Sequence, residues 1–162
     1  MVGIFGLALS LAAGQASADR LYTFSGVTFS DGGTLTGTFT TNDPITTLLD
    51  YNITTSPGTG IGFNYTPTTA PANFSSLPSI IVVETTPVLD HLLEVTFNGG
   101  LTALGASITI GTFDSFEQGM GGARRDITAG AATPTVPEPG TLVLLSTGLA
   151  GLLGFGWRRQ HT

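Results

Sequence analysis

Apolar and polar residues alternate with a period of two through most of the chain, and this pattern limits its fold class. In residues 34–40, Leu35 and Phe39 lie on one face and threonines on the other, and in residues 49–54 Leu49 begins a second apolar face. This is the pattern of a β-strand with one buried face. It predicts strands over residues 21–29, 34–40, 49–54, 79–84, 89–97 and 106–110, with a bulge near Gly26 and with 79–84, a β-branched run, as a central strand.

Glycine-containing turns separate these strands, as at residues 31–33 (Asp-Gly-Gly), which predict a hairpin. Short strands at this spacing favour an all-β fold, an antiparallel β-sandwich, and leave jelly-roll and immunoglobulin-like topologies both open. We expect this domain to span residues 19–128. Residues 129–136, rich in Ala, Thr and Pro, are expected to form a flexible linker.

Charge and cysteine content exclude several functions. The formal net charge of −6 disfavours nucleic acid as a partner. The chain has no cysteine, which excludes disulfides, thiolate nucleophiles and Cys-ligated zinc. Only 10% of residues are charged while the mean hydropathy is +0.32, so we expect apolar segments outside the folded domain.

The N-terminal 18 residues have the features of a signal peptide. An apolar stretch at 2–13 precedes Ala16 and Ala18, the small residues that a signal peptidase reads, and Asp19 would begin the mature chain. A positive n-region is missing, since Arg20 is the first basic residue. The alternative is a buried N-terminal helix.

A charge-free apolar run near the C-terminus predicts a transmembrane helix. Residues 141–156 would reach about 24 Å as a helix, slightly short of the hydrocarbon core. Arg158 and Arg159 follow the run, compensate by snorkelling and form a cytoplasmic stop. A buried core helix is the alternative, which the glycines of the run disfavour. The predicted membrane-span residues include Thr141, Leu142, Val143, Leu144, Leu145, Leu149, Leu152, Leu153 and Phe155.

Two prolines flank a carboxylate at the outer edge of this span. Pro137, Glu138 and Pro139 hold the chain extended and deny it regular hydrogen bonding, which suits recognition by a membrane-embedded enzyme. The order of this tripeptide, apolar span and arginine pair resembles the PEP-CTERM sorting signal of bacterial exported proteins. On this resemblance, residues 137–160 form the sorting signal and the tripeptide is the recognition motif.

The resemblance implies a partner and a destination. The partner is an exosortase, a membrane transpeptidase of Gram-negative cells that make exopolysaccharide. The precursor would cross the inner membrane once, with its C-terminus in the cytoplasm, before delivery to the cell surface or biofilm matrix. The ligand of the β-domain stays open, with exopolysaccharide as a candidate.

Candidate catalytic and metal-binding residues in the middle of the chain are few. His91 is flanked by Asp90 and Glu94, but these carboxylates would lie about 13 Å apart along a strand, so we expect a packed histidine with outward acids. Asp31, Asp114 and Glu117 match no calcium loop and are expected to be solvated turn acids. Residues 124–126 (Arg-Arg-Asp) suggest a surface ion-pair patch. We predict no catalytic site, metal or cofactor.

Two functions are consistent with these sequence features. The first is a non-enzymatic exported surface or biofilm-matrix protein, processed at its PEP-CTERM signal. The alternative is a single-pass, membrane-anchored polysaccharide-binding β-domain that is not processed. For the alternative, we expect aromatic residues to gather on one exposed sheet face; the residues to check are Tyr22, Tyr51, Phe63 and Tyr65.

Overall fold

The computed structural model describes residues 19–59, 62–85, 90–102, 105–119 and 123–135, together with Gly148. All regular structure in the five ranges is β-strand. The signal peptide predicted for residues 1–18 lies outside the described residues. The strands are β1 (Arg20–Phe29), β2 (Thr34–Thr41), β3 (Leu48–Thr55), β4 (Asn64–Tyr65), β5 (Ala72–Asn73), β6 (Ile80–Glu84), β7 (Leu92–Thr96), β8 (Ile108–Thr109), β9 (Phe116–Gln118) and β10 (Arg124–Thr135).

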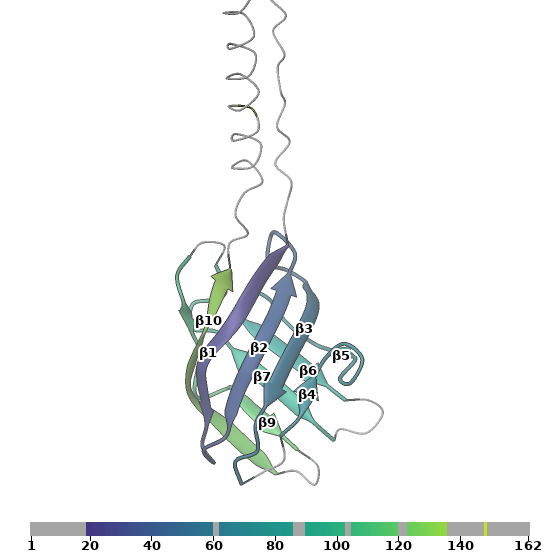
Figure 1. Ribbon diagram of the computed structural model, residues 1–162, viewed down its shortest axis with the longest axis vertical. Helices are drawn as coiled ribbons and strands as arrows, with labels where there is room; N and C mark the ends of the chain where they lie inside the picture. Colours follow the sequence, from purple (N-terminus) through teal and green to yellow (C-terminus); the bar gives the residue numbers. More distant parts are fainter. Residues whose placement is uncertain are drawn as a thin grey trace, which may run out of the picture.

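The strands form one continuous antiparallel sheet in the order β4-β3-β2-β1-β10-β9-β7-β6-β5, with β8 pairing to β10. The sheet curls so that its two halves face each other across a common core (Figure 1). The first residues of β10 pair with β9 and the following ones with β1, so this long strand belongs to both halves. The all-β antiparallel prediction is therefore confirmed. The prediction of a sandwich of two separate sheets is not confirmed, because β10 joins both halves into one sheet.

The β1–β2 hairpin forms as its sequence predicts. Phe29 N donates to Gly33 O at 2.8 Å, and Asp31 Oδ1 accepts from Gly33 N at 3.0 Å. The register between β1 and β10 shifts after Ser25, beside Gly26, whose φ is +61°. A glycine adopts this backbone without the clash that a Cβ would cause, so the bulge lies where the sequence predicted it.

The inward residues of the alternating pattern build the core. Leu35, Phe39 and Ile53 are buried as predicted, and the rings of Tyr22 and Phe39 stack with their centroids 4.8 Å apart. Burial of each such side chain contributes about 1.5–3 kcal/mol to folding. Hydrophobic burial along β1, β2 and β3 therefore fixes which face of the sheet points inward.

Leu49 was predicted to face inward but is 47% exposed. Thr40 pairs with Asp50 while Thr41 pairs with Leu48, so Leu49 is an extra residue in the register. The bulge turns Leu48 into the core and Leu49 outward.

The run at residues 79–84 was predicted to be a central strand. In the structure β6 lies second from one end of the sheet, between β7 and the two-residue β5. Ile80 and Val82 are accordingly only half-buried, while Ile81 and Val83 on the other face are fully buried. The β-branched composition therefore identified a strand but not its place in the sheet.

The flexible linker predicted at residues 129–136 is wrong as far as Thr135, because these residues belong to β10. Ala131 and Ala132 pair with both β1 and β8, and Thr135 pairs with Leu21. The folded domain therefore extends beyond its predicted boundary at 128. Val136 lies outside the described residues.

The strands define two ends of the domain (Figure 1). At the terminal pole, β1 begins, β10 ends and residues 42–47 connect β2 to β3. The distal pole holds the β1–β2 turn at residues 30–33, the connection that follows β3, and the β9–β10 turn. Both ends of the folded domain thus leave from the same pole.

Candidate functional site

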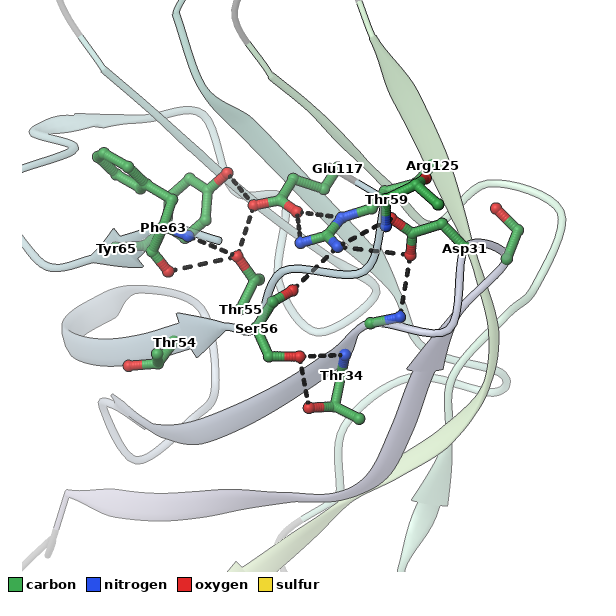
Figure 2. Close-up of polar contacts among 12 residues, drawn as sticks. Asp31, Thr34, Thr54, Thr55, Ser56, Thr59, Phe63, Tyr65, Glu117 and Arg125 are labelled. Atoms are coloured by element: carbon green, nitrogen blue, oxygen red, sulfur yellow. Dashed lines mark hydrogen bonds and ion pairs between the residues drawn. The ribbon is translucent and has the colours of Figure 1, made fainter. Parts of the chain in front are cut away.

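Charged and hydroxyl-bearing side chains meet at the distal pole (Figure 2). We call this group the Arg125 cluster; its members are Asp31, Thr55, Tyr65, Glu117 and Arg125. Glu117 on β9 and Arg125 on β10 are direct partners in the antiparallel register. Their side chains are only 3% and 8% exposed. Arg125 Nε donates to Glu117 Oε2 at 2.6 Å, and Nη2 forms an ion pair with the same oxygen.

Arg125 also binds the loops of the distal pole. Its Nη1 lies 3.2 Å from Asp31 Oδ2 in the β1–β2 turn and donates to Ser56 O, after β3, at 3.0 Å. Asp31 Oδ2 in turn accepts from Thr59 N at 3.1 Å. One guanidinium therefore connects three segments that are far apart in the sequence. The planar group with its five donors is well suited to this role.

The second oxygen of Glu117 is also paired. Oε1 accepts from Thr55 Oγ1 and from Tyr65 OH, both at 2.8 Å. Burial, followed by the adjacent Glu117 charge, raises the pKa of Tyr65 above its ordinary value, so the phenol stays a neutral donor. Thr55 Oγ1 then accepts from Phe63 N at 2.9 Å. Both carboxylate oxygens of Glu117 thus have hydrogen-bond donors, as burial requires.

Two glycines next to the cluster leave space for its charged side chains, because they have no Cβ. A Cβ added to Gly33 would lie 2.4 Å from Arg125 Nη1, and one added to Gly58 would lie 2.5 Å from Asp31 Cγ. The Asp-Gly-Gly and Pro-Gly turns therefore serve close packing against charged groups as well as chain reversal.

The arrangement holds the loops of the distal pole together. The guanidinium is held by two carboxylates and one carboxylate by two hydroxyls, so these groups are already engaged. Among the described residues, no group of three or more His, Asp or Glu side chains is placed to hold a metal ion. Removing one member of such a buried ionic network costs about 3–5 kcal/mol.

The cluster corrects two predictions from the sequence. Glu117 was expected to be a solvated turn acid but is buried on β9, and Asp31 retains only 12% side-chain exposure; Asp114 is exposed, as expected. The surface ion-pair patch holds for Arg124 and Asp126, which meet at 2.8 Å, but Arg125 between them points inward.

His91 packs as predicted, next to the cluster. Its ring stacks on Phe63 with the centroids 4.2 Å apart, and Phe63 contacts Tyr65 edge-on. Asp90 and Glu94 are half-buried. Burial raises the pKa of Glu94, Asp114 raises it further, and Arg124 partly opposes the shift.

The predicted aromatic platform is absent at the residues proposed for it. Tyr22, Tyr51 and Tyr65 are all less than 5% exposed and belong to the core, and Phe63 packs against that core. Sugar stacking needs an open ring face, so these four residues do not provide it.

The predicted sorting and targeting residues lie almost wholly outside the described ranges. Asp19 is exposed and immediately precedes β1. Within the described ranges, no helix has the length and hydropathy needed to cross a membrane. The predicted residues that the structure does not describe are Ala16, Ala18, Pro137, Glu138, Pro139, Arg158, Arg159 and the named apolar residues of the predicted span.

Comparison with known proteins identifies one feature. Residues 135–160 match the family model of the PEP-CTERM protein-sorting motif. No curated protein and no solved structure matches the chain. The motif marks an exported protein that is retained at the membrane as a precursor and addressed to an exosortase.

Proposed function

We propose, from the PEP-CTERM protein-sorting motif at residues 135–160, that this chain is a non-enzymatic exported protein of the cell surface or biofilm matrix. Its tail holds the precursor in the inner membrane until an exosortase cuts it near residues 137–139. Residues 141–156 form the single span, and Arg158 and Arg159 keep the C-terminus in the cytoplasm. The motif match is the observation that carries the proposal.

The fold agrees with a structural role for the exported part. The charged groups of the Arg125 cluster bind one another and fasten the loops of the distal pole. A domain fastened in this way suits a protein that must persist outside the cell. The two sheet halves share one core, so the exported part consists of a single folding unit.

The alternative, an unprocessed polysaccharide-binding anchor, loses its structural support. Three of the four aromatic residues on which it depended are in the core, and Phe63 packs against the core. The exposed aromatic side chains of the described chain are Phe74 and Phe113, at 67% and 93%, and they lie on separate loops. Processing is therefore supported by the sorting motif, whereas sugar binding has no exposed group of aromatic side chains to support it among the described residues.

Processing can be tested in cells with and without the exosortase. The wild-type chain should give a shorter form in the presence of the enzyme, and a membrane-bound precursor should accumulate without it. Glu138→Ala should accumulate the precursor even with the enzyme present, because it removes the carboxylate of the recognition tripeptide. Glu94→Gln, which removes a carboxylate within the folded domain instead, is the control and should be processed normally. A precursor of constant size in every strain would refute the proposal.

A further inference from the structure

The folded domain ends almost at the sorting motif. Thr135, the last residue of β10, pairs with Leu21 near the start of β1. The matched motif itself begins at residue 135, so only Val136 separates β10 from Pro137. No flexible spacer therefore lies between the hydrogen-bonded sheet and the peptide that the processing enzyme would recognise.

The covalent chain limits how far the domain can stand from the membrane. At about 3.6 Å per residue at most, Pro137 lies within about 7 Å of Thr135, and residue 141, where the predicted span begins, within about 22 Å. The 12 residues of β10 extend over about 36 Å at about 3.3 Å per residue. The connection is thus shorter than the strand that precedes it, and the domain cannot turn its distal pole toward the bilayer.

The terminal pole presents an ordered, hydroxyl-rich loop. Asn42 Oδ1 accepts from Thr46 N and Thr47 N, both at 2.9 Å, which fixes the connection between β2 and β3. The acid of this loop, Asp43, forms an ion pair with Arg20. Because that charge is compensated, the loop has little electrostatic repulsion from anionic lipid headgroups to overcome.

We infer that the terminal pole rests on the headgroup layer of the lipid bilayer, with the loop at residues 42–47 facing the lipid. The distal pole, with the Arg125 cluster, then points away from the membrane. This inference rests on the proposed function, because it takes residues 141–156 as the membrane span. The short connection between β10 and the span keeps this pole close to the bilayer, so the lipid surface is the partner that it contacts.

The orientation can be measured with single thiols, since the chain has no cysteine of its own. Thr47→Cys and Thr59→Cys form a matched pair: both threonines are exposed, and each has its backbone N–H bound to a side-chain oxygen. They lie on either side of β3, whose 8 residues span about 23 Å. The full-length chain, labelled at either thiol with a fluorophore, is inserted into phosphatidylethanolamine–phosphatidylglycerol vesicles that carry a nitroxide on the lipid headgroups.

The nitroxide should quench the label at position 47 several-fold more strongly than the label at position 59. Equal quenching, or stronger quenching at position 59, would overturn the inference. Quenching at position 47 that appears only after exosortase is added to the vesicles would also overturn it, and would assign the pole to the enzyme. If the chain does not float with the vesicles, both the proposed membrane retention and this inference are refuted. If it floats but both labels are quenched equally, only the inference is refuted.

A spacer variant tests the reason for the orientation. Twelve Gly/Ser residues inserted between Thr135 and Val136 add a flexible linker of about 17–21 Å root-mean-square length. The domain can then tumble, so the contrast between positions 47 and 59 should largely disappear. An unchanged contrast would overturn the argument from the short connection.

Discussion

Replacing Arg125 with methionine should destabilise the domain far more than the same change at its neighbour. Arg125→Met leaves the carboxylates of Glu117 and Asp31 facing an apolar side chain, in a site where the arginine itself is 8% exposed. Breaking a buried ionic network in this way costs about 3–5 kcal/mol. For a domain of this size, at about 4 °C per kcal/mol, the melting temperature should fall by about 12–20 °C.

Arg124→Met is the matched control on the same strand. Arg124 also has an acidic partner and an aromatic neighbour: Asp126 at 2.8 Å, and the Phe116 ring centroid at 3.8 Å. Its side chain is 47% exposed, however, and a surface ion pair contributes only about 0–1 kcal/mol. Thermal unfolding of both full-length variants in detergent, followed by circular dichroism, gives the comparison. If the melting temperatures of Arg125→Met and Arg124→Met differ by no more than a few degrees, Arg125 is not the residue that holds the loops of the distal pole together.

Three further predictions use the same unfolding assay. Gly33→Ala should cost about 1–3 kcal/mol, because its Cβ would overlap a guanidinium nitrogen at 2.4 Å, whereas Gly119→Ala, with its nearest atom at 3.9 Å, should cost little; equal losses would contradict the packing at Gly33. Burial raises the pKa of Glu94 in the folded state, so the protein loses stability as pH rises from the ordinary glutamate value through the raised one. Glu94→Gln should therefore stabilise the protein at neutral pH but not at a pH below the ordinary glutamate pKa. An equal increase in stability at both pH values would show that the raised pKa of Glu94 is not its cause. A chain that lacks residues 136–162 should unfold cooperatively, whereas one that lacks residues 129–162 should not, because it loses the strand pairs with β1 and β8; cooperative unfolding of the shorter chain would contradict the assignment of these residues to β10.

Local alternation predicted six of the ten strands that the structure describes, and the failures depend on contacts with other strands. The face of Leu49 depends on an extra residue in the register with β2, which a single strand's pattern does not reveal. Residues 129–135 looked like a linker because they are rich in Ala and Thr and contain Gly130 and Pro134. Gly130 is required there, since its Cβ would lie 2.6 Å from Val27 Cγ2 at the β1 bulge.

Pro134 also favoured a linker, because its effect on a strand depends on which neighbouring strands pair with it. Proline is excluded from strands that need its N–H in the ladder. In β10, however, β8 pairs only with Ala131 and Ala132, so Pro134 lies beyond it and has β1 as its partner strand. A strand end with one partner tolerates a missing donor. Composition alone therefore suggested a tether where the sheet in fact continues.

The Arg125 cluster was missed because each of its residues is ordinary in its own segment. One signal was available: Arg125 is in phase with Ile127 on β10, and Ile127 is fully buried. Period-two reasoning over that segment would have pointed Arg125 inward and Arg124 outward. The identity of its partners was not accessible in this way, because Glu117 reaches it across a turn and Asp31 from the opposite end of the chain.

The intact mass of the mature protein shows whether the tail is removed by an exosortase. The measurement is made on protein isolated from cells that contain the exosortase and from cells that lack it. We expect a mature chain that begins at Asp19 and ends near Pro139 in the first case, and a chain that retains Arg158 and Arg159 in the second. A mature chain that still carries both arginines in the presence of the enzyme would refute exosortase processing of this protein.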